Sequence, residues 1–294
     1  MNRVNEIIKY KEAHKAGFTG KGIGVAVMDT GIVAHKDFTL PTNRLKAFHD
    51  FVNQEENLYD DNGHGTHVAG IIGGNGYASQ GLYCGLAPQC HIIALKVLTK
   101  NGNGTVSSVL EAVDWIIKHK ERYNIRIVNI SVGTPVYSAF DEDTRLIHGV
   151  NRLWDHQIVV VAAAGNNGPK KMSITTPGIS RKIITVGASE ISNYNKNQYS
   201  GRGPTKNCIV KPEVVAPGNE INSCGLNLSE YVKKSGTSMA TPIVSGAIAL
   251  LLEKEPNLTP MEVKLRLHDT VKNLGYPKNQ QGWGRIEISK LLRL

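Results

Sequence analysis

Three short segments rich in glycine place an aspartate, a histidine and a serine in that order along the chain. They are Asp29-Thr30-Gly31, residues 64–70 (HGTHVAG) and residues 236–242 (GTSMATP). A serine hydroxyl is a weak nucleophile unless a base takes its proton and a carboxylate orients that base. Glycines beside such residues let the backbone and a substrate approach closely. Together the segments predict that Asp29, His64 and Ser238 form an acid–base–nucleophile set.

Each segment also has an ordinary structural interpretation when it stands alone. Asp29 could be a turn residue at the end of a strand, and Ser238 could cap a helix. Pro242 is expected in the first turn of that helix, where its missing N–H costs nothing. Ser238 would then lie at a helix N-terminus, where free N–H groups and the helix dipole favour developing negative charge.

A fourth segment supplies a candidate hydrogen-bond donor. Gly165-Asn166-Asn167-Gly168 follows a run of apolar residues that reads as a buried strand. The Asn166 amide could stabilise an oxyanion together with the Ser238 N–H, or Asn166 could simply be a turn residue.

His64 and His67 also suggest a zinc site, but a metalloprotease helix needs H-E-x-x-H. The glutamate and that spacing are absent, so His67 is expected to be structural.

The elements that position these residues follow from the pattern of apolar runs. Short apolar runs alternate with amphipathic segments, which predicts an α/β fold with a doubly wound, mostly parallel sheet flanked by helices. Functional residues of such sheets lie at the carboxyl ends of strands, as Asp29 does here. The expected strands are residues 24–28, 91–98, 125–130, 158–164 and 183–187, and the expected helices are residues 106–118, 144–156, 239–253 and 260–268.

Composition narrows the class of protein. The chain has 294 residues, a formal net charge of +9 and four cysteines without a C-x-x-C pair. Its basic residues are scattered and not interleaved with aromatic ones, so nucleic acid is not an expected partner. No secretory signal and no apolar stretch of about 20 residues is visible, so no membrane partner is expected. Free thiols favour a cytoplasmic protein; the alternative is a secreted mature form without its signal and propeptide.

Taken together, these segments resemble the subtilisin-like serine proteases, or subtilases, along essentially the whole chain. The resemblance implies a subtilisin-like catalytic domain over residues 1–294, of the intracellular bacterial type and with no evident prodomain. It implies a serine endopeptidase that works through an acyl-enzyme, with Asp29 orienting His64, His64 as the base and Ser238 as the nucleophile. Asn166 would contribute to the oxyanion hole. The matching segments are residues 25–31, 64–70, 95–98, 129–133, 162–168, 216–218 and 236–242.

The resemblance also implies where an extended peptide or protein substrate binds. Ser131-Val132-Gly133 would pair with the substrate backbone and form one wall of the S1 pocket, which holds the P1 side chain. Ala163-Ala164-Gly165 would form the opposite wall. Thr175 would lie at the base of the pocket, next to a cis Thr176-Pro177 bond. A threonine there leaves less room than a glycine, which favours small or medium apolar residues at P1.

No cofactor is needed for this chemistry, but the resemblance aligns Asp37 with a calcium-ligating aspartate of the family. The loop that would complete the site is residues 74–81 here, and it offers few side-chain oxygens and no carboxylate. The sequence therefore leaves a structural calcium site at Asp37 open. The pair Asp60-Asp61, just before His64, could attract a basic residue of the substrate or could belong to a solvated turn.

Two other functions compete with proteolysis. A catalytically silent, subtilase-like module could hold peptides in the same groove, although a binder needs neither His64 nor Ser238. An esterase of the α/β-hydrolase type would carry its serine in G-x-S-x-G and follow the order serine, aspartate, histidine. Neither feature is present. The oligomeric state cannot be read from the sequence.

Overall fold

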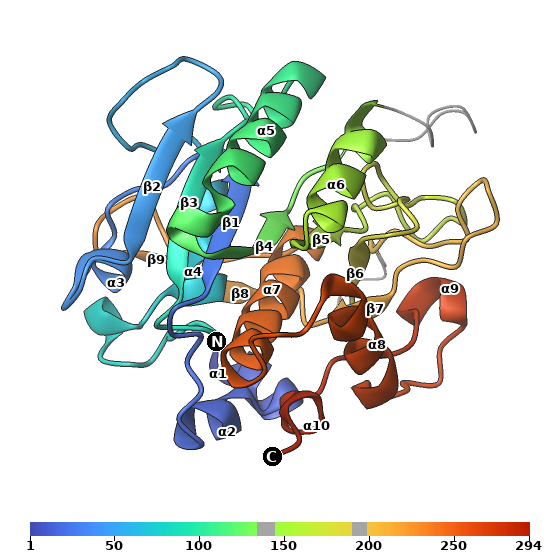
Figure 1. Ribbon diagram of the computed structural model, residues 1–294. Coiled ribbons are helices and arrows are strands. Elements are labelled where there is room, and N and C mark those ends of the chain that lie inside the picture. The colour runs from blue at the N-terminus through green and yellow to red at the C-terminus, as the bar shows by residue number, and fades with distance from the viewer. Residues whose placement is uncertain (134–144, 190–198) are drawn as a thin grey trace.

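A computed structural model describes residues 1–133, 145–189 and 199–294. Its centre is a seven-stranded parallel sheet in the order β2-β3-β1-β4-β5-β6-β7 (Figure 1). Two further strands pair as an antiparallel hairpin. The strands are β1 (Gly24–Asp29), β2 (Leu45–Asp50), β3 (His91–Lys96), β4 (Ile125–Ile130), β5 (Val159–Ala163), β6 (Ile184–Ala188), β7 (Val214–Ala216) and the hairpin strands β8 (Ile221–Cys224) and β9 (Tyr231–Lys234).

Helices cover the sheet and connect its strands. Among the described residues they are α1 (Asn2–Ile8), α2 (Tyr10–Lys15), α3 (Lys36–Thr39), α4 (His64–Gly73), the 3₁₀ turn η1 (Tyr77–Ser79), α5 (Val106–Tyr123), α6 (Arg145–Asp155), α7 (Thr237–Lys254), α8 (Pro260–Thr270), α9 (Lys278–Gln281) and α10 (Ile288–Leu292). In the parts of the chain that the structure describes, no helix has the length and apolarity needed to cross a membrane.

The core forms because both faces of the sheet are covered. Every residue of β1 is buried, which requires helices on both sides of that strand. The helices α5 and α6 pack against each other and the sheet, and α4 and α7 form the second pair (Figure 1). The helix α7 is apolar on nearly all sides, which is typical of a helix in the interior. The predicted doubly wound α/β class is confirmed.

Several boundaries differ from the sequence-based expectation. The edge strand β2 was not predicted because its residues are mostly half-exposed and give no clear apolar run. The helix α5 continues to Tyr123, beyond the expected end at residue 118. Of the expected helix 144–156, residue 144 lies outside the described residues.

The position of Pro242 in its helix was predicted wrongly. The helix α7 begins at Thr237, so Pro242 lies inside it and not in its first turn. In an α-helix the N–H of residue 242 would bond to the carbonyl of residue 238. A proline has no N–H, so the helix leaves the Ser238 carbonyl without its usual donor.

Candidate active site

Five elements bring the predicted residues to the same end of the sheet. Asp29 is the last residue of β1, Ser131 directly follows β4, and Asn166 lies in the turn after β5. His64 is the first residue of α4 and Ser238 the second residue of α7. Carboxyl ends of parallel strands and helix N-termini meet at one edge of an α/β sheet. The topology therefore gathers residues that lie far apart in the chain.

Asp29 and His64 form the first half of the predicted set. Asp29 is almost fully buried, and its Oδ1 lies 2.7 Å from Nδ1 of His64. When Nδ1 carries the proton and donates to the carboxylate, Nε2 is left as the basic nitrogen. Burial alone would lower the pKa of His64, but the negative charge of Asp29 raises the pKa above its ordinary 6.5. His64 is 23% exposed, so a substrate can reach it.

Close backbone packing sets the approach of α4 to β1. A Cβ at Gly65 would lie 2.3 Å from the carbonyl oxygen of Gly31, so only glycine fits there. The N–H of Gly65 donates to the Thr30 hydroxyl at 2.9 Å. Thr30 in turn donates to Oδ1 of Asp60 at 2.8 Å. These contacts fix the start of α4, and with it the backbone of His64, beside Asp29.

Asp60 and Asp61 are both engaged within the protein. Asp60 is buried and accepts hydrogen bonds from the backbone N–H groups of Gly63 and Thr66 at the start of α4. Burial would raise the pKa of Asp60, but these hydrogen bonds lower it. Asp61 lies 2.7 Å from the buried ammonium group of Lys96. These contacts favour a structural role for the pair over attraction of a basic substrate residue.

His67 is structural, as expected from the sequence. Its Nε2 lies 3.0 Å from the carbonyl oxygens of both Ile221 and Val232. These contacts link α4 to both strands of the β8–β9 hairpin. Burial, together with the positive charge of Lys234, lowers the pKa of His67 to about 3. The imidazole is therefore neutral at physiological pH.

Ser238 lines the same cavity as His64, a space of about 290 Å³ that also borders Ser131, Val132 and Gly133. The Ser238 hydroxyl does not point at the imidazole. It donates to the backbone carbonyl of Ser131 at 2.7 Å, and no hydrogen bond joins it to His64 among the described residues. Asp29 and His64 are thus in contact, and Ser238 lines their cavity with its hydroxyl turned to the residue that follows β4.

The side-chain amide of Asn166 is oriented by the helix that carries Ser238. Its Oδ1 accepts from the N–H and the hydroxyl of Thr237, at 3.0 and 3.1 Å. A backbone N–H can only donate, so the atom facing Thr237 must be the oxygen. The donor Nδ2 is therefore directed elsewhere, and the side chain is exposed. This amide and the free N–H of Ser238 in the first turn of α7 can serve one anion.

Thr175 lies between the two predicted walls of the S1 pocket. A Cβ at Gly133 would lie 2.4 Å from Oγ1 of Thr175, and one at Gly165 would lie 2.5 Å from its Cγ2. Thr175 is 4% exposed, and its Oγ1 has no hydrogen-bond partner among the described residues. The expected cis bond between Thr176 and Pro177 is present. The threonine side chain occupies space that a glycine would leave open.

A larger, mostly apolar pocket adjoins the cavity of His64 and Ser238. It has a volume of about 320 Å³, and the two spaces share Leu98, Gly102, Val132 and Gly133. Sequence reasoning missed this pocket, although the apolar residues at the start of α5 were a signal for it. Its apolar lining includes Leu98, Val106, Val109, Ile130 and Leu146.

Asp37 does not fit a calcium site. Its two carboxylate oxygens accept from the Tyr231 hydroxyl, at 2.8 Å each, and from the N–H groups of Ala78, at 2.9 Å, and Gly76, at 3.1 Å. Calcium requires six to eight oxygen ligands about 2.3–2.6 Å away. Hydrogen-bond donors surround this carboxylate where other oxygen ligands would be needed. The loop of residues 74–81 thus binds Asp37 through its own backbone N–H groups.

Neighbouring side chains do not turn this cluster into a site for another metal. His35, Asp37 and Cys224 lie close together and are buried. Nδ1 of His35 already accepts from the N–H of Asp37, and the Cys224 thiol faces Oδ2 of Asp37. Burial raises the pKa of the Cys224 thiol, which keeps it protonated and a poor metal ligand. The cluster is a hydrogen-bonded centre of packing.

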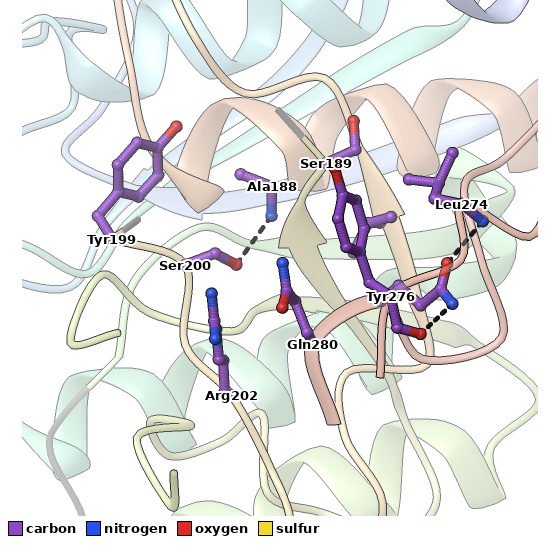
Figure 2. A pocket seen from close by; sticks show the side chains of 10 residues that line it. Ala188, Ser189, Tyr199, Ser200, Arg202, Leu274, Tyr276 and Gln280 are labelled. Carbon is purple, nitrogen blue, oxygen red and sulfur yellow. Dashed lines mark hydrogen bonds between the residues drawn. The ribbon is translucent and has the colours of Figure 1, made fainter. Parts of the chain in front are cut away.

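Figure 2 shows a third pocket. It is formed by residues at and after the end of β6, by the segment 199–202 and by residues in and just before α9. The Ala188 N–H donates to the Ser200 hydroxyl on one side, and Gln281 accepts from the Leu274 N–H on the other. Its volume is about 20 Å³, which holds roughly one water molecule. None of the residues discussed above lines it, so it is not part of the candidate site.

Comparisons with known proteins identify the family and agree with the fold. A profile described as the subtilase family matches residues 20–284. The chain is 41% identical to "Serine protease AprX" of Bacillus subtilis (strain 168) over 290 residues, which covers 90% of this chain and 65% of that protein. It is 36% identical to "Subtilisin Savinase" of Lederbergia lenta, covering 96% of this chain and 94% of that protein. A crystal structure of a cold adapted subtilisin-like serine proteinase superimposes with a TM-score of 0.72 at 30% identity, covering 92% and 88% of the two chains.

Proposed function

The chain belongs to the subtilase family, and from this premise we propose that the protein is a serine endopeptidase. One relative, AprX, is named as a serine protease, but the chain spans only 65% of its length. The activity is therefore part of the proposal, whereas the family is already shown. The observation that carries it is the 2.7 Å contact between Asp29 and His64 in a cavity that Ser238 also lines.

The mechanism begins with a rotation of the Ser238 side chain. Its hydroxyl leaves the Ser131 carbonyl by rotation about the Cα–Cβ bond, a change between staggered states, and turns toward Nε2 of His64. His64 takes the proton as Ser238 attacks the carbonyl carbon of the peptide. Asp29 stabilises the imidazolium that forms.

The negative charge then develops on the substrate oxygen. Nδ2 of Asn166 and the N–H of Ser238 donate to that oxygen. Collapse of the tetrahedral intermediate breaks the C–N bond, and His64 gives its proton to the leaving amine. Water attacks the acyl-enzyme by the same route in reverse, and His64 again serves as base and then acid.

The substrate is a peptide or protein bound in extended conformation along Ser131-Val132-Gly133. Thr175 fills the base of the S1 pocket, which favours a small or medium apolar P1 side chain. The adjoining apolar pocket of about 320 Å³ favours an apolar residue elsewhere in the substrate. Cleavage of a peptide library, read by mass spectrometry, tests both preferences. A strong preference for arginine or phenylalanine at P1 would contradict the role given to Thr175.

A catalytically silent peptide-binding module is the second candidate. The bond between the Ser238 hydroxyl and the Ser131 carbonyl favours it, because this serine is turned away from its base. Labelling by a fluorophosphonate separates the two functions, since only an activated serine reacts. Wild-type protein should be labelled and should cleave casein, whereas Ser238→Ala should do neither while keeping its thermal unfolding profile. Absence of labelling in folded wild-type protein would favour the binding module.

Two features of the sequence analysis stay predictions. The described cysteines are all free thiols, as a reducing compartment would keep them. Location in the cytoplasm, with secretion of a mature form as the alternative, is tested by cell fractionation. Organisation of residues 1–294 as one catalytic domain is tested by limited proteolysis.

A further inference from the structure

A chain of buried polar groups connects the middle of α7 to the end of β4. The Ser245 hydroxyl donates to Oδ1 of Asn129 at 2.8 Å, and Nδ2 of Asn129 donates to Oγ of Ser131 at 2.9 Å. Oγ of Ser131 then donates to the backbone carbonyl of Ser238 at 3.1 Å. Asn129 and Ser245 are fully buried, and Ser131 is 2% exposed.

The Ser238 carbonyl needs this donor because of Pro242. In a regular helix that carbonyl would accept from the N–H four residues later, and a proline has none. An unpaired buried carbonyl costs free energy comparable to a lost hydrogen bond. Ser131 therefore replaces a bond that α7 cannot make, at the turn that carries the candidate nucleophile.

The order of the bonds gives each group one role. Oδ1 of an amide only accepts, so Asn129 uses it for Ser245 and presents Nδ2 to Ser131. Because Oγ of Ser131 accepts this bond, its single hydrogen is directed to the Ser238 carbonyl. Ser131 also binds in the other direction, since its own carbonyl accepts the Ser238 hydroxyl. The two hydrogen bonds between Ser131 and Ser238 therefore join α7 to the segment that would bind substrate.

We propose that Asn129 and Ser245 are positioning residues of the proposed peptidase. Through Ser131 they hold the first turn of α7, and with it the nucleophile and the N–H of Ser238, at a fixed distance from Ser131-Val132-Gly133. Apolar residues would fill both positions without the cost of burying an amide and a hydroxyl. The other buried residues of α7 beyond Pro242 are apolar or glycine, so a hydroxyl at Ser245 stands out in its own helix.

Ser245→Ala tests this role, and Ser180→Ala is its matched control. Ser180 is also buried and also donates to the Oδ1 of an asparagine, Asn151, at 2.7 Å, but neither residue lines the cavity of His64 and Ser238. Competent active sites are counted by the burst of an acylating ester, and kcat is expressed per competent site. We expect kcat of Ser245→Ala to fall about fivefold with little change in KM. Ser180→Ala should lower only the unfolding temperature.

A double-mutant cycle with Ser131→Ala distinguishes positioning from general stability. If Ser245 acts through Ser131, removing the Ser131 hydroxyl should abolish the effect of Ser245→Ala on kcat. The same loss in both backgrounds would overturn the proposal, and so would an unchanged kcat per competent site in Ser245→Ala. The positioning role rests on the proposed function, but the two can be refuted separately. Inactive wild-type protein refutes the peptidase, whereas active wild-type protein with an unaffected Ser245→Ala refutes only the positioning role.

Discussion

Two buried aspartates, Asp29 and Asp37, have opposite hydrogen-bonding environments. Oδ1 of Asp29 contacts His64 and the N–H of Thr30, while its Oδ2 is buried without a partner among the described residues. Both oxygens of Asp37 accept bonds from the protein, with donors from β9 and from the loop after α4. Buried polar atoms are nearly always paired, so an unpaired one calls for an explanation.

The difference distinguishes a candidate catalytic site at Asp29 from a structural cluster at Asp37 that joins neighbouring elements of the fold. Around Asp29, three groups have no recorded hydrogen-bond partner among the described residues: Nε2 of His64, Nδ2 of Asn166 and the N–H of Ser238. Around Asp37 every carboxylate oxygen has its donors, and the cluster joins α3, the loop after α4 and the β8–β9 hairpin. Residues that break a local rule of hydrogen bonding are expected at functional sites. Substitution at the two aspartates should therefore affect different properties.

The largest effect is expected from Asp29→Asn. An amide at this position no longer stabilises the imidazolium and favours the wrong tautomer of His64, so kcat should fall about 10⁴-fold. The unfolding temperature should change little. Asp37→Asn is the matched substitution and should lower the unfolding temperature while kcat at a temperature where it stays folded is retained. Steady-state kinetics and thermal unfolding of both variants are the measurements, and comparable rate losses would erase the distinction.

Asn166→Ala should have the next largest effect. It removes one donor to the developing oxyanion, and for subtilisin itself the corresponding loss in kcat is about 10²–10³-fold. Asn167→Ala removes the neighbouring exposed amide and should leave kcat unchanged. A loss confined to KM would show that Asn166 binds substrate in the ground state instead.

Sequence alone gave the positions of Asp29, His64 and Ser238 because the glycines and small residues around them are local signals. It also gave most strands of the sheet, since buried parallel strands read as continuous apolar runs. Hydrogen bonds between residues far apart in the chain could not be predicted from the sequence. Asn129 meets Ser245 across 116 positions, and Asp37 meets Tyr231 across 194. Only the packing of α7 and of β9 brings such pairs together.

The hairpin of β8 and β9 shows the same limit. Its strands Ile221–Cys224 and Tyr231–Lys234 are short and of mixed polarity, so neither forms a recognisable apolar run. The direction of the Ser238 hydroxyl also could not be predicted, because it depends on the Ser131 carbonyl. The error at Pro242 has a similar cause. The first residue of α7 was placed two positions too late, and helix ends are the least certain part of such predictions.

The dependence of activity on pH should report the charge of Asp29 on His64. The imidazole must be neutral to take the proton of Ser238, and its pKa is raised above 6.5. kcat/KM should therefore fall as pH decreases through a pKa higher than 6.5, approaching a tenfold loss per unit of pH. In Asp29→Asn the residual activity should show this decline at lower pH. The same profile in both proteins would mean that Asp29 does not set the pKa of His64.

A smaller effect, on stability alone, is expected from Tyr231→Phe. Without the Tyr231 hydroxyl, Asp37 keeps only the N–H groups of Gly76 and Ala78 and the weak Cys224 thiol donor. The loss should cost about 1–3 kcal/mol of the free energy of unfolding. Tyr83→Phe is the control, because the ring of Tyr83 packs 4.8 Å from that of Tyr231 but does not bond to Asp37. Denaturant unfolding measures both. kcat of Tyr231→Phe should equal that of the wild type, and a loss of activity without a loss of stability would contradict the comparison.

The smallest effect is expected from the removal of calcium. A ligand that binds only the folded state stabilises it by RT ln(1 + [L]/Kd), which is about 2.7 kcal/mol at a concentration of 100 Kd. Because hydrogen-bond donors of the protein surround Asp37, calcium should not bind there or stabilise the folded state. The unfolding temperature should therefore be the same in calcium and in EDTA. If EDTA lowers it in the wild type, Asp37→Asn locates the metal. Sensitivity to EDTA that disappears in Asp37→Asn would place calcium at Asp37 and overturn the contrast with Asp29, whereas sensitivity that persists would place the metal elsewhere and leave the contrast intact.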